Sequence, residues 1–451
     1  MAAAEYINLV RGWPSTTLLP TEHLSRAAQK ALADPSIAFP GMLYGPDEGY
    51  CPLRETLGFW LTSFYRPEKP VSKERITITG GASQNLGCLL QVFTDPAYTR
   101  DVLFAAPAYM LAFRIFEDNG FAGKMKAVPE DDDGMDMCAL RKVLEESERR
   151  TPEQQLSKPS RPYSKYYRHV IYCVPTFSNP SSRSMPLERR IELVKLAREF
   201  DALVVSDDVY DFLQWPSDSN IPTGITKALW PRIVDIDRFL DGGAERSGAD
   251  GFGNATSSGS FSKICGPGIR VGWSEGSAKF AYGVSQAGTS CSGGAPSQLT
   301  STYMNILVKE GTLSTHIFEI LQPAYAARYK TLMSAIERYL CPLGVKLPQS
   351  RRNVVGGYFL WLTLPNSINA DSFAERCQSE ARVIVAPGSI FEIPGDSSVK
   401  FDHSIRLTFS WVDKDLMVEG VKRISGVLES CLRGEGPIAI RKQDDKDEKP
   451  F

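Results

Sequence analysis

The chain has 451 residues, of which 42% are hydrophobic and 23% charged, and its net charge is -2. This balance is typical of a globular protein and argues against nucleic acid as a partner. No apolar run approaches the length of about 18 residues that a membrane span needs, and the first residues lack a signal-like pattern. We therefore expect a cytoplasmic protein that does not associate with membranes.

Apolar strand-like runs alternate with helical patterns through the first half of the chain. Strands are predicted at 75–81, 101–107, 169–175 and 203–208, and helices at 85–93, 110–118 and 187–200. Such alternation favours an α/β fold, with a mostly parallel sheet and helices on both faces. Ligands of such sheets bind beyond the carboxyl ends of the strands, so the loops after these strands are the place to look for a site.

The later part of the chain has a different pattern. From about residue 315, a long helical pattern leads into three short strand-like runs, at 356–365, 383–391 and 404–411. This favours a smaller α+β domain. The resulting division is an N-terminal segment 1–40 that joins the small domain, a large domain 41–314, and a small domain 315–433.

Three stretches fall outside the regular patterns. Residues 147–168 and 241–258 are polar and rich in Gly, Pro or Ser, which is typical of surface insertions. The charged tail 434–451 is expected to be disordered. The nine cysteines form no C-x-x-C pair and the four histidines show no ligand spacing, so we expect no metal site.

The segment GSFSKICGPGIR, residues 259–270, has the most specific chemistry. It brings Ser260, Ser262, Lys263 and Arg270 within eleven residues. Two hydroxyls and a guanidinium can hold a phosphate dianion, because arginine forms charge-assisted bidentate bonds with it. A partly desolvated lysine near another cation has a lowered pKa and can form an imine with an aldehyde. The alternative is a surface lysine in a Ser/Gly loop.

Other polar residues stand at the ends of predicted strands or within them. The turn TGGASQ, residues 79–84, opens a helix, and its free amides form an anion site. A buried strand ends in Asp207 and Asp208, and a buried carboxylate needs a cation nearby. Arg406 lies in an alternating apolar strand, so it needs either an anionic ligand or a salt bridge at a sheet edge.

Together these motifs resemble the class I and II aminotransferases, which depend on pyridoxal 5′-phosphate (PLP) and have the aspartate-aminotransferase fold. S-x-S-K followed seven residues later by Arg is similar to the PLP-lysine motif of that family, and residues 6–430 follow the family in order. The chain looks closest to the 2-aminoadipate or multisubstrate branch and its fungal relatives. The resemblance implies the PLP-dependent transferase type I fold, with PLP bound as a Schiff base to Lys263.

The resemblance also implies a role for each matching residue. Tyr109 would stack on the pyridine ring, Asp207, rather than Asp208, would pair with its nitrogen, and Asn179 and Tyr210 would bind its phenolic oxygen. Gln84 is a further candidate in the glycine turn. The implied cofactor contacts are Gly81, Ala82, Ser83, Tyr109, Asn179, Asp207, Tyr210, Ser260, Ser262, Lys263 and Arg270. The family usually has Thr-Gly where this chain has Ser181 and Ser182, which leaves the local turn open.

The same comparison predicts how substrate and a second subunit are bound. Gly12, Asn179 and Arg406 are the implied substrate contacts, Arg406 holding the α-carboxylate. Tyr44 would cross to the cofactor phosphate of a neighbouring subunit, which implies a homodimer, and residues 292–298 could approach the same site. Arg11 stands where the branch usually has glycine. It could reach a side-chain carboxylate of the substrate or form a surface salt bridge.

The predicted activity is transfer of the amino group of an L-amino acid to a 2-oxo acid such as 2-oxoglutarate. The amino acid would be 2-aminoadipate or one with an aromatic or other bulky side chain, and Lys263 would move the Cα proton. A β-eliminating lyase or a cyclising synthase would use the same lysine. A non-catalytic, PLP-holding regulatory protein is the alternative of another class, and the presence of every proton-transfer and anchoring residue argues against it.

Overall fold

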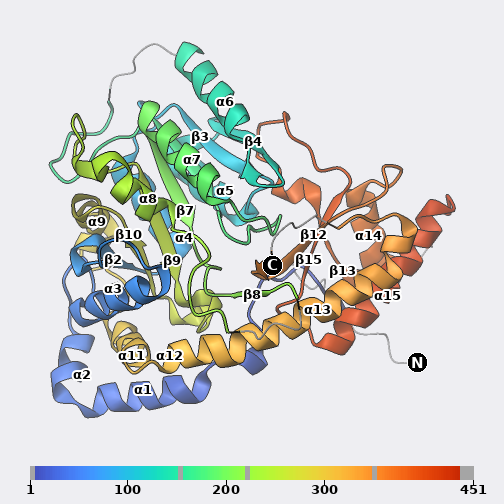
Figure 1. Ribbon diagram of the computed structural model, residues 1–451, viewed down its shortest axis with the longest axis horizontal. Coiled ribbons are helices and arrows are strands. Elements are labelled where there is room, and N and C mark those ends of the chain that lie inside the picture. Colours follow the sequence, from blue (N-terminus) through green and yellow to red (C-terminus); the bar gives the residue numbers. More distant parts are fainter. Residues whose placement is uncertain (1–5, 151–155, 219–223, 348–352, 437–451) are drawn as a thin grey trace.

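The structure is a computed structural model, which describes residues 6–150, 156–218, 224–347 and 353–436. An eight-stranded sheet forms its larger part, in the order β2-β10-β9-β7-β6-β3-β4-β5 (Figure 1). Of these strands, β10 and β5 run against the direction of the others, so the sheet is mostly parallel. Its strands are β2 (Ile76–Thr79), β3 (Asp101–Ala106), β4 (Met125–Asp131), β5 (Gly134–Met135), β6 (His169–Cys173), β7 (Ala202–Asp207), β9 (Ala255–Ser260) and β10 (Gly272–Glu275).

Helices cover both faces of this sheet, as the sequence predicts (Figure 1). The helices of this part are α1 (Thr21–Ala33), α2 (Pro35–Met42), α3 (Cys51–Tyr65), α4 (Ala82–Phe93), α5 (Met110–Phe116), α6 (Met137–Arg150), α7 (Leu187–Glu199), α8 (Ile233–Phe239), α9 (Ala278–Ser285), α10 (Gly288–Cys291), α11 (Gln298–Lys309) and α12 (Thr312–Thr315). None of the helices in the described ranges is both long and apolar enough to cross a membrane.

Strand β3 illustrates how the sheet is buried on both sides. Val102 and Phe104 belong to the core under α4 and α5, whereas Leu103 and Ala105 belong to the core under α6 and α7. Side chains alternate between the faces of a strand, so a strand covered on both faces needs a continuous apolar run. The polar residues that follow such runs are therefore placed at the carboxyl edge of the sheet.

A smaller part follows the long helix α13 (Gln322–Tyr339), which runs along one side of the molecule (Figure 1). Its three-stranded sheet has the order β12-β15-β14, and α14 and α15 pack with it. Its elements are β12 (Phe359–Thr363), α14 (Ala370–Ala381), β13 (Val383–Ile384), β14 (Ala386–Pro387), β15 (Ser404–Thr408) and α15 (Lys414–Leu432). A short ladder of β8 (Gln214–Pro216) with β11 (Val354–Gly356) joins the two parts.

The N-terminal residues divide between the two parts. Strand β1 (Ile7–Asn8) pairs in parallel with β13 of the smaller part, as expected for a segment that joins the small domain. Helices α1 and α2, however, pack against α11 of the larger part. The assignment of residues 1–40 to the small domain remains a prediction. Hydrogen bonds of residues 9–13 continue the contact with the smaller part, whereas the apolar face of α1, with Ala27 and Ala31, is buried against the larger part.

Both predicted insertions are shorter than expected. Residues 147–150 are the last turn of α6, and 255–258 lie in the buried strand β9, where Ser257 and Ser258 are closed off from solvent. The run 254–258 is strand-like in sequence despite its polarity, and the hydroxyl of Ser257 bonds inward to Asp208. Residues 151–155 and most of the tail, 437–451, lie outside the described residues.

Candidate active site

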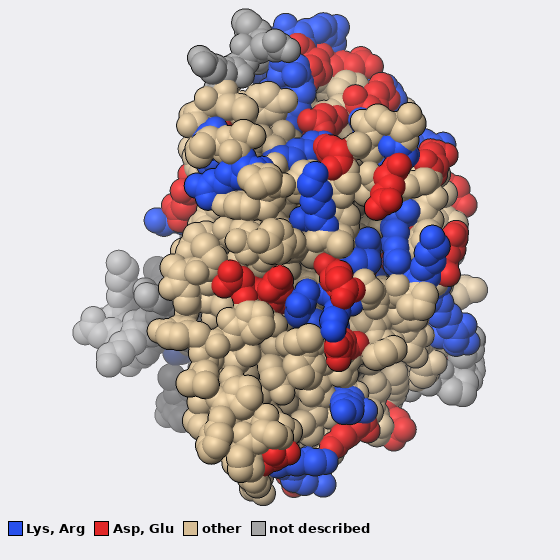
Figure 2. Space-filling view, turned by 90° about the vertical axis from the view of Figure 1, so that its left-hand side faces the viewer, with Lys and Arg blue, Asp and Glu red and all other residues tan. Residues whose placement is uncertain are grey.

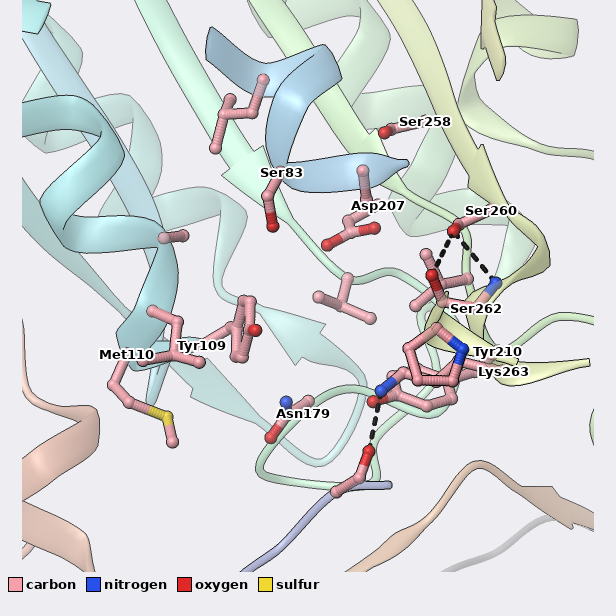
Figure 3. A pocket seen from close by; sticks show the side chains of 18 of the residues that line it. Ser83, Tyr109, Met110, Asn179, Asp207, Tyr210, Ser258, Ser260, Ser262 and Lys263 are labelled. Carbon is pink, nitrogen blue, oxygen red and sulfur yellow. Dashed lines mark hydrogen bonds between the residues drawn. The ribbon is translucent and has the colours of Figure 1, made fainter. Parts of the chain in front are cut away.

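A cavity of about 280 Å³ opens at the carboxyl edge of the large sheet. It lies where β3, β6, β7 and β9 end, and the smaller part closes it with Phe359 and Arg406. Figure 3 shows Ser83, Tyr109, Asn179 and Asp207 around the same space as Lys263. The predicted residues that line the cavity are Gly12, Ala82, Ser83, Tyr109, Asn179, Asp207, Tyr210, Ser260, Ser262, Lys263, Arg270 and Arg406.

Lys263 ends a single helical turn that follows β9 directly. Its Nζ donates a hydrogen bond of 2.8 Å to the carbonyl oxygen of Gly12 (Figure 3). Burial lowers the pKa of this amine to about 8; the charge of Asp207 opposes the change and that of Arg406 adds to it. A lysine with this pKa has a neutral, nucleophilic fraction near neutral pH.

Asp207 is the last residue of β7 and points into the cavity. The hydroxyl of Tyr172 donates to its Oδ2 at 2.7 Å, whereas Oδ1 has no partner in the part of the chain that the structure describes. Burial raises the pKa of this carboxyl to about 6. Asp208 instead accepts bonds from the hydroxyls of Ser206 and Ser257, away from the cavity. The geometry therefore favours Asp207 over Asp208, as the spacing to Tyr210 predicts.

The anion-binding end of the cavity is built from two turns. Gly81 precedes α4 with a φ of +101°, and a Cβ there would come within 2.9 Å of an Arg270 nitrogen, so both turns are in contact. Arg270 also donates to the carbonyl oxygen of Gly80. The hydroxyls of Ser260 and Ser262 are hydrogen bonded at 2.8 Å beside them (Figure 3). A helix N-terminus, an arginine and two hydroxyls together suit a phosphate.

Arg406 lies fully buried on β15 of the smaller part and lines the same cavity. Its Nη1 donates to Oδ1 of Asn179 at 2.7 Å and its Nη2 to the carbonyl oxygen of Val10, while the ring of Phe359 lies 4.0 Å from the guanidinium carbon. Burial lowers the pKa of Arg406 to about 10. No carboxylate pairs with it among the described residues, so the edge-strand salt bridge is not the explanation for this charge.

Two tyrosines border the space between these ends. Tyr109 stands at the start of α5, and burial, with Asp207 nearby, raises the pKa of its phenol to about 12. Burial also raises the pKa of Tyr210, whose ring centre lies 5.8 Å from the Nζ of Lys263. Both phenols therefore stay neutral and can donate hydrogen bonds.

The Asn179 turn forms despite the serines in it. Ser182 donates its amide to the carbonyl oxygen of Ser178 at 2.7 Å and has a φ of +61°, the left-handed region that favours glycine. Its hydroxyl donates to the carbonyl oxygen of Phe359, which compensates for that conformation. The turn that the sequence leaves open is therefore present.

Two candidates lie elsewhere. Tyr44 is 90% exposed and contacts the 292–298 segment, where its ring lies against Gly293. Gln84 turns back to accept from the amide of Gly80 and does not line the cavity.

Nothing in the sequence points to Tyr172 or Phe359, because their roles depend on which strands are neighbours. Tyr172 could have been found from the in-register pairing of β6 with β7.

Comparisons with known proteins agree with this fold. The family profile for aminotransferase class I and II matches residues 4–424. The chain is 34% identical to the uncharacterized protein YER152C of Saccharomyces cerevisiae, over 94% of this chain and 97% of the other. It is 27% identical to aromatic-amino-acid aminotransferase 1 of Thermococcus litoralis, over 95% and 89%.

A solved structure is also similar. The alpha-aminoadipate aminotransferase LysN of Thermus thermophilus, complexed with N-(5′-phosphopyridoxyl)-L-leucine, superposes with a TM-score of 0.73. The identity is 26%, over 95% of this chain and 93% of that one. A parallel sheet with a buried lysine, an aspartate and an anion-binding turn at its carboxyl edge defines a PLP-binding transferase. The chain belongs to the class I and II aminotransferase family, and its activity is PLP-dependent amino-group transfer.

The residues of the cavity fit this cofactor. The unpartnered Oδ1 of Asp207 can accept from a protonated ring nitrogen, and the Gly81 turn with Arg270 can take the phosphate. Lys263 would bind the aldehyde, because its amine is uncharged in part at neutral pH.

Proposed function

We propose that the enzyme moves the amino group of an L-amino acid with a bulky side chain, such as 2-aminoadipate or an aromatic amino acid, to 2-oxoglutarate or another 2-oxo acid. The observation that carries the proposal is that one cavity is lined by three kinds of group. Ser260, Ser262 and Arg270 suit a phosphate, Arg406 is a buried guanidinium without an acidic partner among the described residues, and Lys263 is a buried amine.

Arg406 and Asn179 would hold the α-carboxylate. The Nε of Arg406 has no partner within the described ranges, and the Asn179 contact at 2.7 Å orients the guanidinium. A two-pronged bond from a preoriented arginine fixes the direction of the Cα–H bond. Burial makes this bond stronger than it would be in water.

Lys263 would form the covalent bond to the cofactor and, once displaced by the substrate amine, remove the proton from Cα. Its pKa of about 8 supports both roles, because a base works best when its pKa lies near the working pH. The cofactor, when bound, supplies an electron sink for the charge left on Cα. Asp207 would sustain that property by keeping the ring nitrogen protonated.

The side chain of the substrate would lie against the first turns of α5 and the N-terminal segment. Met110, Leu111 and Ile115 of α5 line the cavity there, with Trp13 and Arg11 opposite. The apolar side chains suit an aromatic ring or a long methylene chain. The guanidinium carbon of Arg11 lies 5.0 Å from the Trp13 ring centre, at a position from which it could approach a distal carboxylate.

A homodimer is part of the proposal. Phe39, Met42, Leu43 and Tyr44 are all more than half exposed at the end of α2, which is a large apolar surface for a single chain. Figure 2 shows that the lower part of this side of the molecule, where α2 lies, is mostly uncharged, whereas charges of both signs cover the upper part. Tyr44 would cross from this surface to the partner's phosphate site.

A cytoplasmic location is likewise proposed, because all nine cysteines are free.

A spectral experiment tests the proposal. Purified protein loaded with PLP should be yellow, lose that colour on addition of 2-aminoadipate or an aromatic amino acid, and regain it with 2-oxoglutarate. Lys263→Ala should abolish the cycle. Release of pyruvate and ammonia without an added oxo acid would instead indicate an eliminating lyase. Arg11→Ala tests side-chain recognition: equal losses of activity on 2-aminoadipate and on an aromatic amino acid would show that Arg11 does not recognise the substrate side chain.

A further inference from the structure

Tyr358, which stands between β11 and β12 and has no role in the steps above, contacts the catalytic lysine from the smaller part of the molecule. Its hydroxyl donates a hydrogen bond of 2.9 Å to the main-chain carbonyl oxygen of Lys263. The centre of its ring lies 5.5 Å from Nζ of the same lysine. Tyr358 is fully buried, which raises the pKa of the phenol well above its ordinary value, so the hydroxyl remains a donor.

The main chain of Tyr358 is fixed to the strand that carries Arg406. Its carbonyl oxygen accepts from the amide of Phe409 and from the hydroxyl of Thr408, both at 3.1 Å. Thr408 is the last residue of β15, two residues beyond Arg406. Phe359, which follows Tyr358 in the chain, lies with its ring against the Arg406 guanidinium. Two consecutive residues, Tyr358 and Phe359, therefore contact Lys263 and Arg406.

This arrangement affects the distance that matters most for proton transfer. A substrate anchored by Arg406 presents its Cα–H bond to Lys263 only if the two side chains keep a fixed separation. They belong to different parts of the chain, 143 positions apart by their numbers 263 and 406. A misplacement of about 1 Å can reduce a rate by about a hundredfold.

We propose that Tyr358 is a positioning residue, which sets the main chain of Lys263 relative to the carboxylate anchor on β15. The inference rests on the proposed roles of Lys263 and Arg406. Tyr325 supplies a matched control, because its hydroxyl lies 3.1 Å from that of Tyr358, in the same buried pair of tyrosines, but it does not bond to Lys263.

The test compares Tyr358→Phe with Tyr325→Phe, each of which removes one buried hydroxyl and keeps its ring. Tyr358→Phe should lower kcat about tenfold, with KM for the amino acid within about twofold, since one lost hydrogen bond is worth about that factor. A substrate deuterated at Cα should show a larger isotope effect on kcat than in the wild type. The apo variant should also form its covalent bond with added PLP several times more slowly. Tyr325→Phe should change each of these values by less than about threefold.

A wild-type protein that lacks the colour cycle would overturn the proposed function. If the wild type is active but Tyr358→Phe has unchanged kcat, isotope effect and PLP reaction, or if Tyr325→Phe matches its losses, only the positioning role fails. Tyr358→Leu, which removes ring and hydroxyl together, should show at least the same kinetic losses. Thermal melting of each variant shows whether a kinetic loss comes from a smaller folded fraction instead.

Discussion

At the scale of single residues, Asp207 has conflicting requirements. Its carboxylate must be ionised to pair with a ring nitrogen, yet burial raises its pKa from 3.8 to about 6. The folded chain therefore binds a proton between these pH values that the unfolded chain has already released. Stability of the apo protein falls as pH rises from about 4 to about 6, and the cost stays constant above that.

Asp207→Asn should consequently stabilise the apo protein and inactivate the enzyme. The pKa difference, 3.8 against about 6, corresponds to about 3 kcal/mol, or about 3 °C in melting temperature for a chain of this length. This gain should be present at pH 8 and absent at pH 4. Transamination should fall at least about a hundredfold, because the group that holds charge at the ring is lost.

The holoenzyme is the control for this prediction. With PLP bound, the carboxylate gains a cationic partner, so Asp207→Asn should lose its advantage in melting temperature at pH 8. An apo variant that melts at the wild-type temperature at both pH values would show that Tyr172 alone already compensates the buried charge.

Asp207, at the end of an apolar strand, and Arg406, within one, were predictable, since a buried carboxylate or arginine is costly without a partner. Lys263 was predicted from its serine and arginine neighbours, and all three residues line one cavity. Tyr172 and Tyr358 were not predictable. Buried tyrosines are common in cores, and nothing local shows which main chain or carboxylate a phenol will meet.

At the scale of elements, the junction of β2 with α4 is the most constrained turn of the site. Gly81 has a φ of +101°, and a Cβ would lie 2.9 Å from Arg270. Gly81→Ala should therefore destabilise the protein by at least about 1 kcal/mol from backbone strain. It should also weaken PLP binding by about tenfold or more, since Arg270 has to move. Calorimetry and titration of the apo protein with PLP would measure both effects.

Gly87 provides the matched control in the same helix. A Cβ at this position meets nothing within 4 Å, and its φ is not positive. Gly87→Ala should leave PLP affinity unchanged and stabilise the helix by up to about 1 kcal/mol, because alanine is the better helix former. Equal losses of affinity in the two variants would contradict a specific role for the Gly81 turn.

Element types were easier to predict than element boundaries. The alternation of apolar strands and helices predicts the mostly parallel sheet correctly. Strand β9, with the sequence ATSSGS, falls partly within a predicted insertion, since it contains no large apolar residue. Its serines can be buried because Ser257 donates to Asp208, next to strand β7, and Ser258 accepts from Asn85 of α4, contacts that only the tertiary structure provides.

At the scale of the whole molecule, the site draws residues from nearly the full length of the chain, from Val10 to Arg406. The division into a large domain 41–314 and a small domain 315–433 remains a prediction. Two hydrogen bonds to Lys263 favour tight coupling of the two parts. Its Nζ donates to the carbonyl oxygen of Gly12, and its carbonyl oxygen accepts from the hydroxyl of Tyr358.

A mixing experiment tests whether the active unit is a dimer with shared sites. Tyr44→Ala removes the crossing residue and should weaken PLP binding about tenfold or more, whereas Lys263→Ala removes the lysine and should be inactive. In a hybrid dimer, the site with Lys263 receives Tyr44 from the other chain and is complete. Random reassortment makes about half of the dimers hybrid, each with one intact site of two, so about a quarter of the wild-type activity should return at limiting PLP. Lys263→Ala alone should stay inactive, and Tyr44→Ala alone should keep about a tenth or less of the wild-type activity under that condition. A mixture with no more activity than the sum of its parts, from chains that sedimentation shows to exchange, would mean that Tyr44 serves only its own subunit or none.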